Sequence, residues 1–419
     1  MSGYPHRVAM ISMHTSPLAT PGVGDAGGLN VYVAEVVRRL GERGLEVDVL
    51  TRTHDPDQPE IVEVNEHARV VHVPAGPLAP VAKEQLPALV PVFAAALEAK
   101  ITGYDLLHTH YWLSGMIGVA LADRHRLPLV HTMHTMARVK NAALGVGQQT
   151  EPDVREHGEA EIVRRADTLT ANTSDEATEL QQHYGARPEQ LVIVPPGVDL
   201  HTFHPCDQPK SRAQLGVAQG AQVILFVGRI QPLKAPDVLI RAVAELVVRE
   251  PRRRADLRLI IIGSPSGPDA GWSHTLAPLA AALGVSDLVE FRPHSERAEL
   301  FRWYCVADVV GVPSYNESFG LVAVEAQATG TPVVAAAVGG LGTAVRDGVS
   351  GLLVEGHDPA DYARAMARVV ASPELRDQLS RGAVAQAAGF TWDATAARTL
   401  AVYLAADASM RDDLAGSLG

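Results

Sequence analysis

The chain alternates short apolar runs with longer amphipathic stretches from its first residues almost to its last. In the first half the apolar runs are 8–12, 46–51, 69–75, 105–110, 127–134, 168–174 and 191–199. In the second half they are 223–229, 258–264, 289–294, 308–314, 332–340 and 351–356. Near-continuous apolar strands separated by helical patterns are typical of parallel sheets that helices cover on both faces. The pattern predicts two successive doubly wound α/β domains.

The two series are separated by residues 194–216, a proline-rich stretch of mixed polarity without a clear period. Such a stretch predicts an interdomain linker. The chain has 419 residues, more than one hydrophobic core usually serves. The mostly helical tail is broken at 389–393, which predicts a last helix that returns to the first domain. We therefore expect a first domain of residues 1–197 plus 398–419 and a second of 198–397, both Rossmann-like and facing a cleft.

Composition narrows the class of protein. The formal net charge of -12 argues against nucleic acid or an anionic membrane as the main partner. No apolar run reaches the roughly 18–20 residues that span a bilayer, and the apolar run near the start is too short for a signal peptide. The two cysteines, Cys206 and Cys305, lack CxxC spacing, so we expect neither a disulfide framework nor a cysteine zinc site. A reducing cytoplasm is the expected location.

Two glutamates mark the most informative segment of the second domain. Glu317 precedes an apolar helical stretch and Glu325 lies within it, eight positions on, a little over two helical turns. The apolar run 308–314 leads into this segment, and ligands of open α/β sheets bind at the carboxyl ends of strands. A helix-capping carboxylate and a surface charge are the plainer interpretation. We favour a site in which Glu325 binds a ribose diol and Glu317 orients a sugar.

Cations follow another strand of the same domain. Arg229 ends the run 223–229, and Lys234 comes five residues later, before a helical stretch. Such a pair is usually solvated surface, but here it lies in the same domain as the two glutamates. Arginine binds phosphate oxygens through two donors, and lysine adds a point charge. Together they predict support for a leaving nucleoside diphosphate, and hence a glycosyltransferase that uses a nucleotide sugar.

A glycine-rich turn and a histidine pair are the candidate sites of the first domain. Residues 22–30 carry four glycines before a helix, so Gly27 and Gly28 are expected to bring backbone N–H groups to a phosphate; tight packing is the equal alternative. His131 and His134 end an apolar run. No carboxylate joins them for metal binding, so we expect His131 to be structural and His134 to donate a hydrogen bond near the transferred sugar. We expect His108 and His110 to be structural.

With these segments in view, the chain resembles the retaining GT-B glycosyltransferases of family 4, which include sucrose and sucrose-phosphate synthases. The resemblance covers nearly the whole chain and rests on GDAGGLNVYV, HTMHT, PPGVD, VGRIQPLKAP, PSYNESFGLVAVEAQATGTPVVA and GLLV. The first segments are similar to a narrower branch, known from actinobacteria. That branch transfers N-acetylglucosamine from UDP-GlcNAc to 1D-myo-inositol 3-phosphate, with retention of configuration, in the first step of mycothiol biosynthesis.

The resemblance implies roles for the matching positions. Gly28, Arg229, Lys234 and Glu325 would bind the UDP, with Glu317 on the donor sugar; His134, Glu317, Arg229 and Lys234 would serve catalysis. The acceptor inositol phosphate would contact His14, Asp25, Ala26, Gly27, Gly28, Leu29, Asn30, Lys83, Tyr111, Thr135 and Arg155. No cofactor is implied for catalysis. A structural magnesium is implied at Tyr304, Cys305, Ala307 and Thr331, largely through backbone carbonyls, and a homodimer is the expected assembly.

The same resemblance implies a mechanism without a covalent intermediate, in a site assembled by domain closure. The residues alone leave other functions open. A sucrose-phosphate-synthase-like enzyme using UDP-glucose and a sugar phosphate would need the same cations. A nucleotide-sugar epimerase or hydrolase would release products without an acceptor, and a noncatalytic sensor would bind without turnover.

Overall fold

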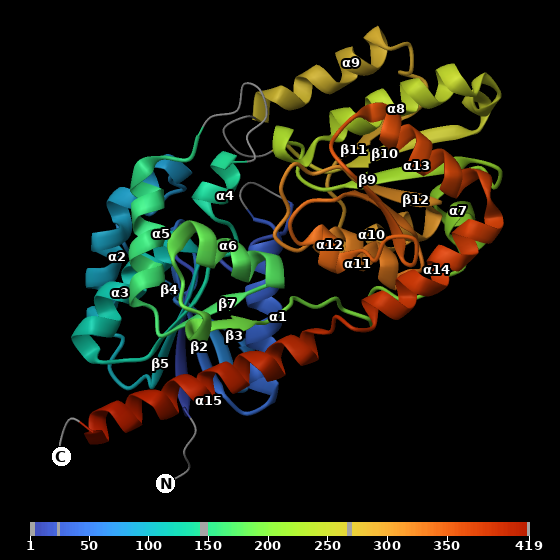
Figure 1. The fold of residues 1–419 in the computed structure, drawn as a ribbon. Helices are drawn as coiled ribbons and strands as arrows, with labels where there is room; N and C mark the ends of the chain where they lie inside the picture. Colours follow the sequence, from blue (N-terminus) through green and yellow to red (C-terminus); the bar gives the residue numbers. More distant parts are fainter. Residues whose placement is uncertain (1–4, 23–25, 143–149, 266–269, 417–419) are drawn as a thin grey trace. The chain divides into compact units, whose positions relative to one another are not determined.

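The computed structural model describes residues 5–22, 26–142, 150–265 and 270–416 of the chain, with the side chains of 409–416 excepted. These residues form two compact units, each built around its own parallel sheet (Figure 1). The first unit comprises Met1–Pro21, Gly28–Pro195 and Trp392–Gly419, and the second comprises Gly22–Gly27 and Pro196–Thr391. The predicted boundaries at 197/198 and 397/398 fall close to these limits.

The first unit has an eight-stranded sheet in the order β3-β4-β2-β1-β5-β6-β7-β8. Its strands are β1 (Arg7–Ile11), β2 (Glu46–Arg52), β3 (Ile61–Asn65), β4 (Ala68–Val73), β5 (Leu106–His110), β6 (Leu129–Thr132), β7 (Thr168–Ala171) and β8 (Leu191–Ile193). Its helices are α1 (Gly28–Glu42), η1 (Lys83–Leu89), α2 (Val90–Glu98), α3 (Tyr111–His125), α4 (Ala137–Ala142), α5 (Asp153–Arg165), α6 (Ser174–Tyr184), η2 (Pro188–Gln190) and α15 (Trp392–Gly416). All pairings are parallel except that of β3 with β4.

The second unit has a six-stranded parallel sheet in the order β11-β10-β9-β12-β13-β14. Its strands are β9 (Gln222–Val227), β10 (Leu257–Ile262), β11 (Val289–Arg292), β12 (Val309–Val312), β13 (Val333–Ala336) and β14 (Gly351–Val354). Its helices are α7 (Gln208–Leu215), η3 (Pro232–Lys234), α8 (Pro236–Arg249), η4 (Pro251–Ala255), η5 (Ala270–Thr275), α9 (Leu276–Ala282), α10 (Arg297–Val306), α11 (Leu321–Ala328), α12 (Leu341–Ala344), α13 (Pro359–Ala371) and α14 (Pro373–Ala387).

Each sheet reverses its strand order at one place. In the first unit the chain builds outward from β1 to β2 and β4, and then continues from β5 on the other side of β1. In the second unit the same reversal falls between β9 and β12. At such a switch point the two connections leave toward opposite faces of the sheet, which opens a crevice at the carboxyl ends of the two strands. The two doubly wound domains predicted from the apolar runs are confirmed.

Strands form where their side chains can be buried, and helices begin and end at residues that cap them. Strand β9 buries Val223, Ile224, Leu225 and Phe226 between helices, because both faces of a parallel sheet are covered. Helix α6 begins where the Thr173 hydroxyl accepts the backbone N–H of Glu176. The helix ends at Gly185, whose φ of 70° is left-handed and suits a residue without a side chain.

The structure corrects the prediction for the linker, adds one strand that was not predicted and shows which unit contains the last helix. The expected linker 194–216 contains helix α7, which begins where Asp207 accepts the backbone N–H of Lys210. The apolar periodicity of α7 is weak because few of its residues are buried, so the apolar pattern gave no signal. The local signals were Asp207 before the helix, a proline in its first turn and Gly216 after it. The antiparallel edge strand β3 was not anticipated either. The last helix, α15, belongs to the first unit and packs against α1 (Figure 1).

The expectation of two unlinked cysteines is wrong. Cys206, just before α7, forms a disulfide with Cys305 near the end of α10, with their Cα atoms 6.0 Å apart. The sequence showed only two distant cysteines, and a pairing across 99 positions cannot be derived from spacing. The disulfide also removes the cysteine-based argument for a reducing compartment. In the part of the chain that the structure describes, no helix has both the length and the apolarity to cross a membrane.

The disulfide predicts a measurable difference between oxidised and reduced protein. Because the bridge closes a loop of 99 positions, removing it frees the unfolded chain and should lower the free energy of unfolding by about 2–4 kcal/mol. The double variant Cys206→Ser/Cys305→Ser and the reduced wild type should show the same loss in urea unfolding. Thiol titration of unfolded protein should find no free thiol before reduction; two free thiols at that stage would contradict the bridge.

Candidate functional site

The switch point of the second unit holds the predicted donor residues. Strand β9 leads through Arg229 into η3, which ends at Lys234, and β12 leads through Ser314 to Glu317. The Lys234 ammonium lies 2.5 Å from the Glu317 carboxylate, and the Ser314 hydroxyl donates to the same carboxylate at 3.4 Å. Both charged side chains are about one-fifth exposed, at 20% and 17%. The structure thus brings together the cation and the carboxylate that the sequence assigned to the donor.

Backbone packing fixes the position of Glu317. The Glu317 carbonyl accepts the N–H of Gly340, 2.8 Å away in the loop after β13. A Cβ at Gly339 would lie 2.4 Å from that carbonyl, and one at Gly340 would lie 2.3 Å from the carbonyl of Ser318. Only glycine allows this approach. The loop after β12 and the loop after β13 are therefore in close backbone contact at Glu317.

Glu325 lies on α11, as predicted, and one of its oxygens is already engaged. Its Oε2 accepts the Tyr304 hydroxyl at 2.9 Å. Burial raises the pKa of the Glu325 carboxyl to about 7, opposed by the nearby Arg297 and by the hydrogen bond from Tyr304. A ribose diol bound here would therefore use the other carboxylate oxygen as its main acceptor.

The switch point of the first unit collects the predicted acceptor residues. His14 follows β1 and Tyr111 follows β5, and their ring centroids are 4.4 Å apart. The Lys83 ammonium and the Arg155 guanidinium lie 5.3 Å and 5.0 Å from the centre of the Tyr111 ring. Arg155 Nη2 also donates to the carbonyl and the hydroxyl of Thr135, at 3.1 Å and 3.0 Å. Five residues from distant parts of the sequence thus surround one position.

Unsatisfied polar atoms point to a ligand at this position. His14 Nδ1, the Tyr111 hydroxyl and Arg155 Nη1 are buried without a hydrogen-bond partner. Buried polar groups are normally paired, so such a group of orphaned atoms is expected where a ligand completes the pairing. Burial, with the charges of Lys83, His134 and Arg155, holds the pKa of His14 well below its usual value. His14 is therefore neutral at pH 7 and can donate or accept one hydrogen bond.

Backbone strain marks the same edge of the sheet. Tyr111 and His134, which follow β5 and β6, have positive φ angles of 69° and 61°. For residues with side chains such a conformation costs on the order of 1–3 kcal/mol, and it occurs mainly at functional sites. His134 Nε2 is hydrogen-bonded to His110 Nδ1 at 2.8 Å, so a ligand contact of His134 must involve Nδ1.

The glycine-rich segment is only partly described. Asp25 lies outside the described residues. Gly27 falls in the short stretch grouped with the second unit, whereas Gly28 begins α1 in the first. The predicted helix start at this turn is confirmed. Other predicted contacts there are engaged within the protein: the Asn30 amide donates to Thr15 and Ser16, Leu29 packs against the first core, and Ala26 is buried.

The carboxylate that pairs with Arg155 was not predicted from the sequence. Glu159, fully buried, accepts Arg155 Nε at 2.7 Å, the backbone N–H of Ala137 at 2.8 Å and the hydroxyl of Tyr184. The spacing of four between Arg155 and Glu159 on one helix was a usable signal, because such residues face each other. Lys140 and Glu151 also join this cluster, and no periodic pattern marked them.

The predicted magnesium residues lie together in the second unit, and the Tyr304 and Ala307 carbonyls already accept hydrogen bonds. The Tyr304 carbonyl accepts the Thr331 hydroxyl at 2.8 Å, and the Ala307 carbonyl accepts Gln208 Nε2 at 2.9 Å. Cys305 is bound to Cys206, and the neighbouring Val306 carbonyl accepts the Arg212 guanidinium at 3.1 Å. A guanidinium beside the position does not favour a divalent cation. A magnesium ion here stays a prediction from the resemblance.

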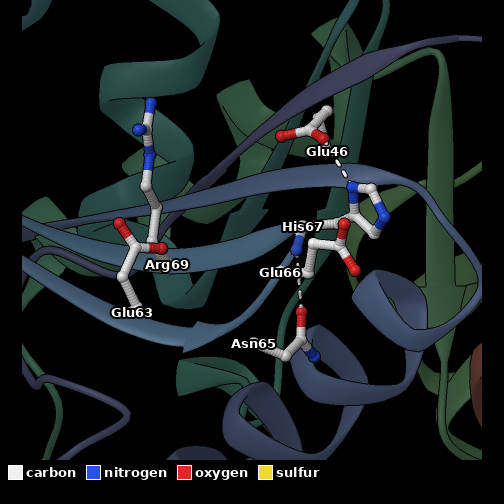
Figure 2. A pocket seen from close by; sticks show the side chains of 6 residues that line it. All are labelled: Glu46, Glu63, Asn65, Glu66, His67 and Arg69. Atoms are coloured by element: carbon white, nitrogen blue, oxygen red, sulfur yellow. Dashed lines mark hydrogen bonds and ion pairs between the residues drawn. The ribbon is translucent and has the colours of Figure 1, made fainter.

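Away from these clusters, a hollow opens at the amino ends of β2 and β4. Figure 2 shows its lining residues: Glu46, Glu63, Asn65, Glu66, His67 and Arg69. The Glu46 carboxylate accepts a hydrogen bond from His67 at 2.7 Å and thereby raises the pKa of that histidine. The hollow lies at the wrong end of the strands for a switch-point ligand, and its carboxylates would repel phosphates.

The two halves of the chain match two glycosyltransferase family models. Residues 26–202 match Glycosyltransferase Family 4, and residues 207–386 match the glycosyl transferases group 1. With the two doubly wound domains, these matches define a glycosyltransferase of the GT-B class.

Relatives give a narrower assignment. A D-inositol 3-phosphate glycosyltransferase from Geodermatophilus obscurus is 53% identical over 414 residues, 98% of this chain and 91% of the relative. The enzyme of the same name from Streptomyces bingchenggensis is 52% identical over 405 residues, 95% of this chain and 89% of the relative. The chain belongs to the family of the D-inositol 3-phosphate glycosyltransferases. The resemblance stated from the motifs is confirmed.

Solved structures share the architecture. Sucrose-phosphate synthase from Thermosynechococcus elongatus superimposes with a TM-score of 0.87 and 32% identity, over 96% of this chain and 100% of the other. The Anabaena protein HepE, in complex with UDP and glucose, superimposes with a TM-score of 0.73 and 20% identity, over 98% of this chain and 100% of the other. At that identity the second likeness concerns the fold alone.

The buried histidines of the first unit predict a loss of stability in acid. Burial lowers the pKa of His131 to about 3, below the ordinary 6.5, so the unfolded chain binds more protons between these values. The stabilisation is complete above about pH 6.5 and declines as the pH falls toward 3. Between pH 8 and pH 5, His131 alone should account for a loss of about 2 kcal/mol in the free energy of unfolding.

Urea unfolding at pH 8 and pH 5 tests this loss. His131→Gln should show a smaller pH dependence than wild type, whereas His157→Gln, at an exposed position of α5, should keep the wild-type dependence. Equal pH dependence in all three proteins would show that His131 does not titrate on unfolding.

Proposed function

We propose that the protein transfers N-acetylglucosamine from UDP-GlcNAc to 1D-myo-inositol 3-phosphate with retention of configuration, the first step of mycothiol biosynthesis. The observation that carries the proposal is the cationic cluster at the first switch point. Lys83, Arg155 and the orphaned Tyr111 hydroxyl form a set of donors suited to a phosphate monoester. The names of the relatives support this acceptor.

The second unit supplies the donor half of the proposal. Arg229 and Lys234 neutralise the diphosphate, Glu325 binds the ribose, and Glu317 orients the sugar. Without a ligand the Lys234 charge is balanced by Glu317. As the glycosidic bond breaks, negative charge develops on the diphosphate, and a cation held in place stabilises that charge more than it stabilises the bound donor.

The proposed transfer needs no covalent intermediate. A ring hydroxyl of the acceptor attacks the anomeric carbon on the face from which the diphosphate leaves, and a diphosphate oxygen takes the hydroxyl proton. Attack and departure on one face retain the configuration. His134, kept neutral by burial that lowers its pKa to about 3, can donate only from Nδ1 to a sugar oxygen. No metal step is required.

One alternative has an observation of its own. The likeness to sucrose-phosphate synthase, at 32% identity, favours a transferase that uses UDP-glucose and a sugar phosphate. The same cations would bind the phosphate of that acceptor. Residues that contact ring hydroxyls would have to distinguish the two acceptors.

Release of UDP by the purified protein tests the proposal. With UDP-GlcNAc, release should depend on added 1D-myo-inositol 3-phosphate, and mass spectrometry should find one N-acetylglucosamine-inositol phosphate per UDP. Activity with UDP-glucose and a hexose phosphate instead would favour the alternative. Acceptor-independent release of sugar would indicate a hydrolase.

Lys234→Ala should lower kcat by about 100-fold or more, because a transition-state cation is lost. Arg249→Ala is the matched control, since Arg249 lies on α8 and forms an ion pair with Glu245 on the same helix. Steady-state kinetics and circular dichroism separate a catalytic loss from unfolding. A folded Lys234→Ala protein with wild-type kcat would contradict the role of Lys234.

Lys83→Met should raise KM for the phosphorylated acceptor by about tenfold, the effect of one lost charge-assisted contact. The KM for UDP-GlcNAc should stay the same, because Lys83 lies in the first unit, whereas Arg229, Lys234, Glu317 and Glu325 lie in the second. An equal rise in both KM values would instead indicate a structural effect.

A cytoplasmic location, a homodimer and a structural magnesium belong to the proposal through the resemblance alone. Light scattering coupled to gel filtration would measure the mass of the assembly against the 44.6 kDa of one chain.

A further inference from the structure

A carboxylate already occupies the cationic cluster of the first unit. Lys140, in the last turn of α4, hydrogen-bonds through its ammonium to Glu151. The other oxygen of Glu151 lies 2.8 Å from Arg155 Nη1. Glu151 therefore lies between an ammonium and a guanidinium, and the same guanidinium contacts Thr135 and Tyr111.

The two carboxylates on Arg155 differ in how firmly they are held. Glu159 is fully buried, and its oxygens are shared among Arg155, Ala137 and Tyr184. Glu151 has 21% of its side chain exposed, and among the described residues its carboxylate contacts the two cations Lys140 and Arg155 alone. Its contact with Arg155 Nη1 is close but poorly aligned for a hydrogen bond, because that atom has no hydrogen-bond partner. Glu159 is thus the fixed partner of Arg155 and Glu151 the exchangeable one.

Electrostatics keeps Glu151 ionised in this position. Arg155 and Lys140 lower the pKa of the Glu151 carboxyl to about 2, against the effect of its burial. Burial, together with the charges of Arg155 and Lys83, works to lower the pKa of Lys140, and Glu151 opposes this. Lys140 and Arg155 both contact the Glu151 carboxylate, and Arg155 and Lys83 both lie over the Tyr111 ring, so the three cations form one cluster.

We propose that Glu151 occupies the place of the acceptor's phosphate, and that binding exchanges this carboxylate for the phosphate on Arg155 and Lys140. Lys140 is thereby a further phosphate-binding residue beside Lys83 and Arg155. The inference rests on the proposed function for the identity of the acceptor, but not for the exchange itself. A phosphate monoester carries more negative charge than a carboxylate and three acceptor oxygens, so it satisfies donors that Glu151 leaves unpaired.

The exchange also gives a basis for specificity. When the site is empty, Glu151 balances Lys140, whose charge would otherwise be unpaired, and adds a second carboxylate to Arg155. A neutral polyol has no group to replace the carboxylate and cannot displace it. The site therefore selects for the phosphorylated acceptor against its unphosphorylated form.

Titration calorimetry with inorganic phosphate tests the exchange without the reaction. Glu151→Gln keeps the size of the side chain and removes its charge, so it should bind phosphate about tenfold more tightly than wild type, about 1.4 kcal/mol. Lys140→Met should bind phosphate about tenfold more weakly. Glu151→Asp keeps the charge but withdraws it by one methylene, so its affinity should fall between wild type and Glu151→Gln.

Kinetics with UDP-GlcNAc and the phosphorylated acceptor provide the second readout. Glu151→Gln should lower the acceptor KM and leave kcat and the donor KM unchanged. Glu161→Gln, in the neighbouring helix α5 and paired with Arg164, is the matched control and should behave as wild type.

Weaker or unchanged phosphate binding in folded Glu151→Gln would overturn the exchange, because Glu151 would then only hold the cations in position. If inositol 3-phosphate supports no turnover in wild type while Glu151→Gln binds phosphate more tightly, the proposed function fails and the exchange stands.

Discussion

The site chemistry depends on the reversal of strand order in each parallel sheet. In the first unit His14 follows β1 and Tyr111 follows β5, the two strands at the reversal. In the second unit Lys234 follows β9 and Glu317 follows β12, again the two strands at the reversal. Connections that leave toward opposite faces keep helices out of the space between those strand ends. One topological rule, applied twice, therefore places an anion-binding cluster in one unit and a cation–carboxylate pair in the other.

The burial of charged side chains then determines which ligands can bind at these positions. Arg155 is 1% exposed, and Glu159, Thr135 and Glu151 stabilise its buried charge. Beside this guanidinium, the Tyr111 hydroxyl and His14 Nδ1 are buried without a hydrogen-bond partner. In the second unit Glu317 serves Lys234 in the same way, within reach of the loop from β13. The first cluster thus keeps unpaired polar atoms, as expected of a site that binds an anionic ligand.

The features that could be predicted from the sequence are the apolar strands and the residues that directly follow them. Apolar runs located every strand of both sheets except β3, an edge strand whose side chains are mostly exposed or half-buried. The glutamates and the Arg229–Lys234 pair could be found because each follows an apolar strand. Lys83 and Arg155 were named only through the family resemblance, since an isolated cation in a helix carries no local signal. The disulfide between Cys206 and Cys305 and the Lys140–Glu151 pair depend on tertiary contacts, which a single sequence does not encode in any local pattern.

The central claim is that the phosphorylated acceptor and the nucleotide bind at the switch points of different units. A crystal structure of the protein with UDP and 1D-myo-inositol 3-phosphate would locate the phosphorus atoms of both ligands. The account predicts the acceptor phosphate within hydrogen-bond distance of Lys83, Arg155 and Tyr111, and the UDP diphosphate beside Lys234. An acceptor phosphate bound at Lys234, or a diphosphate bound at Arg155, would contradict it.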